Sequence, residues 1–487
     1  MDAITSPSPA ADAAPADTEA SLRASVESAP NHFRPLLELA RHLSDARKFD
    51  ESVEYALQAV ALDPESFEAT LVLGSALKEL KRYEQARQHL ARALALNPTH
   101  VVALFNLAFT LRELGLEDEA EGLYKRIIEI APQHVGPYVN LGSIYEGRGD
   151  HARGYENHVK AVQCNPDEPQ ARHNLSMSRL RMGEFEAGWA DFEYRRKVPG
   201  KGSFTGNMTC PEWQGEPLEG RKILITSEQG AGDAIQFIRY ARLLKERGAA
   251  RVDALVSTAL VDVMGHVDGI DHAYVTCDAK DYDYWALMMS LPYRCGTTMA
   301  SIPAKPYITP DPVKAETWRT RLTGIAQGRL RVGLVWAGNP LHARDNYRSI
   351  TLRELEPVLA APNIAWFALQ KGAAAQAQLA QLGGNSYVCC LSDYLANFAD
   401  TAAVIANLDL VIAVDTSVAH LAGALGKQVW VLLAYNSDWR WLIEREDSPW
   451  YPTASLFRQT RLGQWSDVVD RLGHALDAWQ VATGMQE

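Results

Sequence analysis

A 34-residue periodicity in the first part of the chain is the feature that most constrains its fold. Prolines recur at this interval, and so do leucines, each followed by a small residue: Pro64, Pro98, Pro132 and Pro166; Leu39, Leu73, Leu107, Leu141 and Leu175; Ala40, Gly74, Ala108, Gly142 and Ser176. Each unit carries two amphipathic helical patterns. Because such a unit buries its apolar face only by stacking on neighbouring units, the period predicts a helical solenoid.

Each recurring residue has a physical role in this arrangement. The small residue lets the two helices of a unit approach, the leucine fills the space between them, and the proline stops the second helix. The units resemble tetratricopeptide repeats over about residues 31–196. In the last unit, "RMGEFEAGWADFEYRR" places Gly188 and Trp189 near the small-residue phase, which predicts a cap that docks onto the next domain. The array is either a groove for a protein or peptide partner, which we favour, or a spacer.

Composition narrows the class of protein. The 487 residues suggest about three domains, and the net charge of −12 argues against a nucleic-acid partner. The six cysteines show neither C-x-x-C nor zinc spacing, so we expect reduced thiols in a cytoplasmic protein and no metal or cofactor. Residues 1–30 are rich in Ala, Pro and Ser at their start, which predicts a disordered leader. No apolar run is long enough to predict an integral membrane segment.

A stretch rich in Gly, Pro and Thr, "RRKVPGKGSFTGNMTCPEWQGEPLEGRK", ends the helical pattern. Strands and helices then alternate to about residue 322, starting with a buried strand at 222–226 and an amphipathic helix at about 234–247. A second start follows at "LRVGLVWAGNP". This pattern predicts two Rossmann-like domains, at 197–322 and 323–487. Ligands of such domains bind where the parallel strands end, so the loops after the strands are the candidate site.

The first of these loops is "SEQGAGDAIQF". Gly230 and Gly232 allow a tight turn and a close approach to a ligand. A third glycine of the dinucleotide fingerprint is absent, and no G-K-[ST] follows, so neither a dinucleotide site nor a P-loop is indicated. Asp233 lies where the helix begins. It is either the N-cap of that helix or a general base that takes a proton from an acceptor hydroxyl, and both roles are compatible.

Two later loops carry candidate anion contacts. In "VWAGNPLHARDNYRSI", polar and basic residues follow a buried strand, and the alternative is a solvated surface loop: Gly338, Asn339, His342, Arg344 and Arg348. In "FALQKG", Lys371 follows an apolar strand directly. A lysine there either pairs with a phosphate as a point charge or is a surface residue at a strand end.

The stretch "DLVIAVDTSVAHLAGALGKQVWVLL" reads as a buried strand, a turn, a small-residue helix and a second strand. The amides of Thr416 and Ser417 open this helix, where unpaired donors and partial positive charge suit a pyrophosphate. Asp415 lies at the turn. His420, taken alone, is more typical of a structural histidine than of a ligand contact.

Two other motifs have plainer explanations. "YNSDWRWLIEREDSPWYP" holds aromatic residues that either stack on a base or sugar or, more commonly, pack against the sheet. "DYDYW" places Asp281 and Asp283 in a D-x-D, the metal-binding pattern of one class of sugar transferases. In a chain with two Rossmann-like domains we interpret it as a coincidence.

Together these loops resemble glycosyltransferases of the two-Rossmann GT-B fold, over about residues 205–480. "ILITSEQGAGDAIQFIRYARLLKERG" and "DLVIAVDTSVAHLAGALGKQVWVLL" are similar to the corresponding segments of bacterial ADP-heptose heptosyltransferases, with Ser417 where glycine is typical. The whole layout is similar to O-linked N-acetylglucosamine transferases. The fold class expected is therefore an α-helical repeat solenoid followed by an α/β GT-B fold.

The resemblance also implies roles for single residues. Asp233 is the implied general base, Asp415 holds hydroxyls of the donor sugar, and Thr416 and Ser417 give backbone donors to its diphosphate. His420 lies beside the donor. Lys371 and Arg348 are further implied donor contacts.

The function expected is transfer of a sugar from a nucleotide-sugar donor to a hydroxyl, on a protein that the repeats recruit. The helix N-terminus and nearby cations would stabilise the leaving group without a metal, and direct displacement would invert the anomeric centre. Two alternatives stay open: a repeat scaffold whose transferase half has decayed, and a similar enzyme that acts on lipopolysaccharide.

Overall fold

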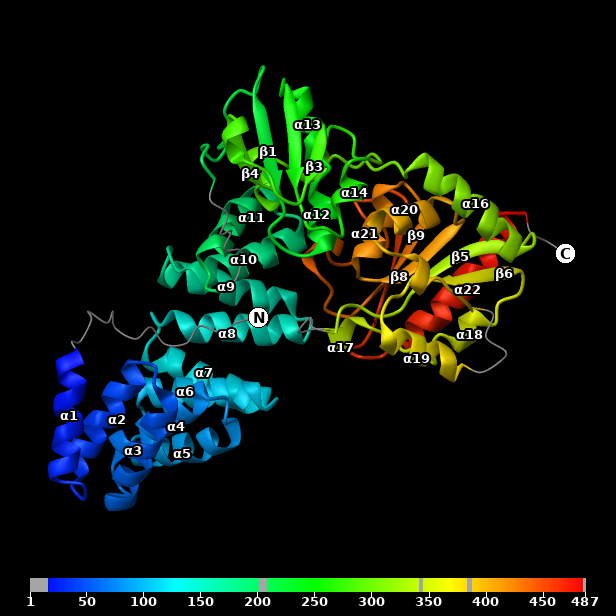
Figure 1. Ribbon diagram of the computed structural model, residues 1–487. Coiled ribbons are helices and arrows are strands. Elements are labelled where there is room, and N and C mark those ends of the chain that lie inside the picture. The colour runs from blue at the N-terminus through cyan, green and yellow to red at the C-terminus, as the bar shows by residue number, and fades with distance from the viewer. Residues whose placement is uncertain (1–15, 201–207, 341–344, 383–387, 485–487) are drawn as a thin grey trace. The chain divides into compact units, whose positions relative to one another are not determined.

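The computed structural model describes residues 16–200, 208–340, 345–382 and 388–484 (Figure 1). The chain forms two compact units, Met1–Leu175 and Ser176–Glu487. Within the described residues, no helix is long and apolar enough to cross a bilayer.

The first unit consists of helices that pair in sequence, as the 34-residue period predicts (Figure 1). They are α1 (Ala16–Ser28), α2 (Phe33–Asp45), α3 (Phe49–Leu62), α4 (Phe67–Glu79), α5 (Tyr83–Leu96), α6 (Val101–Glu113), α7 (Glu117–Ile130), α8 (Val135–Gly147) and α9 (His151–Cys164). Gly74 shows why the small position matters, because a Cβ added there would lie 2.8 Å from Cγ of Leu90 on the paired helix. The prediction of a helical solenoid is confirmed.

The disordered leader expected over residues 1–30 is wrong for helix α1. Leu22 and Val26 are four residues apart, so they lie on one face of this helix, and they pack against Leu36, Leu39 and Leu43 of α2. This contact buries apolar side chains and orders the helix, which the overall composition of the leader does not predict. The rest of the leader, residues 1–15, lies outside the described residues.

Helix α10 (Pro169–Met182) spans the border between the units, and α11 (Phe185–Phe192) and the 3₁₀-helix η1 (Glu193–Lys197) belong to the second. Trp189 of α11 is 1% exposed. Its ring lies 5.3 Å from that of Trp439, 6.2 Å from Trp450 and 6.3 Å from Phe237. The last repeat-like unit therefore docks into the α/β domains after it, and the second compact unit begins before residue 197.

The first sheet of the second unit is parallel, with strand order β3-β2-β1-β4. Its strands are β1 (Lys222–Thr226), β2 (Arg251–Leu255), β3 (His272–Tyr274) and β4 (Tyr284–Leu287). Its helices are α12 (Ala231–Phe237), α13 (Tyr240–Glu246), α14 (Val261–Met264) and α15 (Leu291–Arg294), with short 3₁₀ turns η2 (Ala279–Asp281), η3 (Met288–Ser290) and η4 (Met299–Ser301).

The second sheet is also parallel, with strand order β10-β9-β8-β5-β6-β7. Its strands are β5 (Leu330–Val335), β6 (Ile364–Ala368), β7 (Val388–Cys390), β8 (Leu410–Val414), β9 (Val429–Leu433) and β10 (Ala454–Arg458). Its helices are α16 (Pro312–Ala326), α17 (Asp345–Arg348), α18 (Glu356–Leu359), α19 (Ala373–Gln381), α20 (Phe398–Ala406), α21 (Ser417–Ala424) and α22 (Ser466–Ala482), with η5 (Ser392–Tyr394) and η6 (Trp439–Trp441). Two parallel sheets after a helical solenoid confirm the predicted fold class.

The border between the two α/β domains differs slightly from the prediction. Helix α16 packs against α20, β5 and β6, all of which belong to the second α/β domain. The second α/β domain therefore begins near Pro312 rather than at residue 323. From the sequence pattern, this helix is expected to belong to the first α/β domain, with the strands before it. In the structure it belongs to the second, with the strands after it.

Candidate functional site

A cavity of about 820 Å³ lies within the second unit, between loops that follow strands of both sheets. All candidate site residues that fall within the described part of the chain line it: Gly230, Gly232, Asp233, Gly338, Asn339, Arg348, Lys371, Asp415, Thr416, Ser417 and His420. The loop residues His342 and Arg344 lie outside the described residues. The convergence follows from topology, because the carboxyl ends of parallel strands meet at one edge of each sheet.

Asp233 occupies the first turn of α12, on the first sheet's side of the cavity. Gly230 is the N-cap, and the Asp233 carboxylate accepts a hydrogen bond from its N–H at 2.9 Å. The prediction that Asp233 is the N-cap itself is thus wrong in position, since Asp233 is the third helical residue and reaches back to the cap. Its second carboxylate oxygen accepts a hydrogen bond from Arg440.

Gly232 has a packing role that the sequence did not reveal. A Cβ on this residue would lie 3.0 Å from Cδ2 of His420 and 3.6 Å from Cα of Ser417. Only glycine lets α12 and α21 approach this closely. The close approach at Gly232 is therefore between two helices from different α/β domains.

The N-terminus of α21 forms the opposite wall. Thr416 is the N-cap, with extended backbone, and Ser417 and Val418 open the helix at the cavity surface. The first amides of a helix have no intrahelical acceptor. The buried Thr416 Oγ1 also has no hydrogen-bond partner among the described residues. The amide donors thus lie at the cavity surface where a phosphate would be held.

The pKa values of two carboxylates near this helix are shifted in opposite directions. Burial raises the pKa of Asp415 to about 6, and the nearby Asp438 carboxylate adds to the rise. Burial alone would also raise the pKa of Asp438, but the Arg440 guanidinium overrides it and holds that pKa below its ordinary value. The site therefore holds one acid that ionises near neutrality beside one that stays ionised.

His420 is buried and neutral. Its Nδ1 lies 3.0 Å from the Tyr451 hydroxyl, and its ring stacks on Trp441 at 5.4 Å. Burial and the positive charge of Arg440 lower the pKa of His420 to about 3. The structural interpretation of His420 holds, and the same side chain also borders the cavity.

The cations named from the sequence reach the cavity from the second sheet. Arg348 donates from Nη1 to the Asp415 carbonyl at 3.2 Å and from Nε to Asp345 at 3.1 Å. Lys371 donates to the Leu395 carbonyl. Gln370, beside it, accepts from the Ala337 amide at 3.0 Å, so the loops after β5 and β6 are joined at the cavity wall.

Arg440, like Asp438 near it, is a site residue that the sequence analysis did not identify. It lies on η6, in the aromatic stretch after β9, and donates to Asp438 at 2.8 Å, to Gln236 at 2.5 Å and to Asp233. Its side chain is 9% exposed. Arg440 thus joins the second sheet to the candidate base on the first. Nothing local distinguishes it from a surface arginine.

The remaining sequence motifs resolve into structural roles. The aromatic residues of the same stretch are 1% exposed, so the packing interpretation holds: Trp439, Trp441, Trp450 and Tyr451. Asp283 of the D-x-D accepts a hydrogen bond from the Lys222 amide at 2.8 Å and pairs with Arg221 at 3.0 Å. Lys222 begins β1, so this carboxylate lies at the amino end of the sheet, away from the cavity.

The raised pKa of Asp415 predicts a pH-dependent gain in stability on its removal. The carboxyl has a pKa of about 6 when folded and about 3.8 when unfolded, so its cost to the fold is absent below about pH 3.8, grows as pH rises from there to 6, and is constant above. We expect Asp415→Asn to stabilise the fold at pH 8 by up to about 3 kcal/mol relative to pH 3.5. Thermal unfolding of both forms across this range measures it, and an offset that is constant with pH would contradict it.

Comparison with known proteins agrees with this architecture. Tetratricopeptide repeat models match residues 37–101 and 77–141, and the model "Glycosyltransferase family 9 (heptosyltransferase)" matches residues 395–464. The chain therefore combines tetratricopeptide repeats with a segment similar to family 9 glycosyltransferases. The family 9 match includes Asp415, His420 and Arg440.

One curated relative is Protein FlbA of Caulobacter vibrioides, which is 26% identical over 398 residues, 69% of this chain and 66% of that protein. This chain thus spans just under two thirds of its relative. Solved structures similar to this chain include MamA from Desulfovibrio magneticus RS-1, at 20% identity and a TM-score of 0.31, over 34% of this chain and 97% of MamA. YrrB, "a TPR protein with an unusual peptide-binding site", has 14% identity and a TM-score of 0.31, over 37% and 92%.

Proposed function

We propose that this chain transfers a sugar from a nucleotide-sugar donor to a hydroxyl group of a protein that the repeats recruit. One observation carries the proposal. A single cavity joins a carboxylate on the first sheet, Asp233, to a helix N-terminus and two cations on the second, Arg348 and Lys371. These are the groups that glycosyl transfer needs: a base for the acceptor and a cationic, amide-rich site for the leaving phosphate.

The chemistry of the site divides between its walls. Asp233 takes the proton of the acceptor hydroxyl as its oxygen forms a bond to the anomeric carbon of the donor. The bond from that carbon to the phosphate oxygen breaks, and both electrons stay with the departing nucleotide. The amides of Ser417 and Val418, with Arg348 and Lys371, stabilise that charge. Attack from the side opposite the leaving group inverts the anomeric centre.

The donor side is tested first by binding. A panel of UDP-, GDP-, ADP-, dTDP- and CMP-sugars is screened by thermal unfolding of the full chain, followed by an assay of nucleotide release. One class is expected to stabilise the protein, by about 2.7 kcal/mol when present at 100 times its Kd. If none of them stabilises the chain or releases nucleotide, the site is a docking domain instead of an enzyme.

The acceptor side is tested by removing the repeats. A variant without residues 1–168 keeps α10, in which the second unit begins, and α11 and η1, which belong to it. Tethering a protein partner through the repeats raises its local concentration at the site. Removal of the repeats is therefore expected to lower transfer to proteins of a cell extract by about 10²-fold or more. Nucleotide release without acceptor should change less than twofold. Equal transfer to purified lipopolysaccharide by both forms would point to a glycan acceptor and a repeat array with another role.

A further inference from the structure

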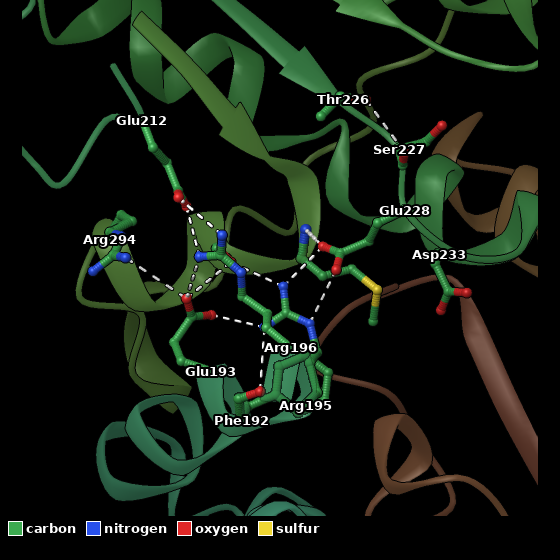
Figure 2. A network of polar contacts seen from close by, with 12 residues as sticks. Phe192, Glu193, Arg195, Arg196, Glu212, Thr226, Ser227, Glu228, Asp233 and Arg294 are labelled. Carbon is green, nitrogen blue, oxygen red and sulfur yellow. Dashed lines mark hydrogen bonds and ion pairs between the residues drawn. The ribbon is translucent and has the colours of Figure 1, made fainter. Parts of the chain in front are cut away.

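A buried ion pair ties η1 to the loop that precedes the candidate base (Figure 2). Arg195 of η1 donates to the Glu228 carboxylate through two bonds, from Nη2 to Oε1 at 2.8 Å and from Nε to Oε2 at 3.1 Å. The Arg195 side chain is 0% exposed and that of Glu228 is 1% exposed. A two-pronged contact of this kind fixes the orientation of both groups as well as their distance.

The remaining donors and acceptors of the pair are also engaged (Figure 2). Arg195 donates to Glu193 at 2.8 Å, to Ser290 Oγ at 2.9 Å and to the Phe192 carbonyl at 3.2 Å. Glu228 accepts a further hydrogen bond from the Met289 amide at 3.3 Å. The guanidinium also lies over the Phe192 ring, 4.6 Å from its centroid. Arg195 thus links the end of α11, the loop after β1 and the turn after β4.

The position of Glu228 in the chain gives this network its significance. Glu228 follows β1 by two residues and precedes Asp233 by five. Between them, Gln229 and Gly230 are exposed, and Gly230 is the residue whose N–H binds the Asp233 carboxylate. The loop therefore has a buried charged anchor at its start. This anchor holds the backbone that leads to Asp233, while Arg440 holds the Asp233 carboxylate directly.

We propose that Arg195 is a positioning residue, which acts through Glu228 to hold the loop after β1 so that Asp233 faces the acceptor. The proposal rests on the proposed function for the role of Asp233, but the anchoring of the loop does not. A buried charge pair is a poor source of net stability, because its desolvation offsets most of its attraction. What the pair contributes instead is one fixed geometry for the two side chains and the backbone that carries them. The segment after the repeats is then part of the catalytic unit rather than a linker to it.

The same 3₁₀-helix provides a matched control. Arg196 donates to the Glu212 carboxylate in the same two-pronged manner, at 2.8 and 2.9 Å. Glu212 lies before β1 and bridges to Trp285 of β4, so this pair does not touch the loop of Glu228. Arg196 approaches the Arg195 network only through Glu193, at 3.9 Å. Arg196→Met removes a guanidinium from η1 while leaving the anchor of the loop in place.

The test compares Arg195→Met, Glu228→Gln and Arg196→Met in the full chain by hydrogen exchange and by kinetics. The first two are expected to speed amide exchange in the peptide 227–237, and Arg196→Met is not. With the donor that the panel identifies, Arg195→Met and Glu228→Gln should lower kcat by about 10²-fold while the donor KM changes less than twofold. A small misplacement of the base affects the chemical step more than donor binding. Arg195→Lys, which keeps one bond to Glu228, should recover part of kcat.

Each outcome bears on one proposal. If the wild-type chain turns over no donor, the proposed function fails, while exchange in 227–237 still decides whether Arg195 anchors the loop. If Arg195→Met does not fold, Glu228→Gln tests the same contact with a side chain of unchanged shape. Exchange and kcat that match those of Arg196→Met would overturn the positioning role. A loss of kcat that comes with a raised donor KM and faster exchange throughout 176–487 would also overturn it, because that is general destabilisation.

Discussion

Replacing Asp233 by asparagine is expected to lower kcat for sugar transfer by about 10²–10⁴-fold, the range for loss of a general base. An amide accepts no proton at neutral pH, yet its oxygen still accepts the hydrogen bond from the Gly230 amide that forms the start of α12. The variant loses the bond from Arg440, but Arg440 keeps its bonds to Asp438 and Gln236, so the fold should survive. Nucleotide release measured with and without acceptor, together with the donor-induced thermal shift, separates these effects.

Asp283→Asn is the control for this substitution. Asp283 is an acid of the same domain, and it accepts hydrogen bonds from Arg221 and the Lys222 amide at the opposite end of the strands. Its replacement should leave kcat within about twofold. An Asp233→Asn variant with full turnover would remove Asp233 from the mechanism. One that lost donor binding as strongly as turnover would move Asp233 to the donor site.

The architecture could be predicted because it depends on patterns among residues that are close together in the sequence. The 34-residue period needs no tertiary information, since each unit repeats the same contact between neighbouring helices. The strand expected at 222–226 is β1, because a continuous apolar run in an α/β chain is typical of a strand buried on both faces. The site followed from a topological rule, which brings loops after parallel strands together without any knowledge of side-chain contacts.

The features that escaped prediction depend on contacts between distant segments. The amphipathic helix expected at about 234–247 is two helices, α12 and α13, with Arg239 between them. This buried arginine donates to the Trp450 carbonyl at 2.7 Å and to the Tyr307 hydroxyl at 3.1 Å. The helical period is the same on both sides of it, so hydrophobicity alone gives no break. Likewise, no spacing rule relates Arg440 to Asp233, 207 residues earlier.

Arg440→Met is expected to lower the free energy of unfolding by about 3–5 kcal/mol, the cost of removing one partner from a buried charge group. Arg440 donates to Asp438, Gln236 and Asp233, and methionine of similar length satisfies none of them. The loss should be largest near neutral pH. Arg440 holds the pKa of Asp438 below its ordinary value, so this stabilisation is present above the unfolded pKa of about 3.8 and is lost as pH falls through the lower, folded pKa.

Denaturant unfolding at pH 7 and at about pH 2.5, below the unfolded pKa of Asp438, measures this prediction, with Arg445→Met as the control. Arg445 lies five residues further along and pairs with Asp447 at 2.7 Å, but their side chains are 38% and 68% exposed. Such an exposed pair contributes at most about 1 kcal/mol. If the two variants unfold alike, the arginine that joins the two sheets at Asp233 contributes no more than a surface ion pair. If Arg440→Met alone is destabilised, and Asp438→Asn in the same chain restores part of the loss, the cost comes from the carboxylate left without its cation.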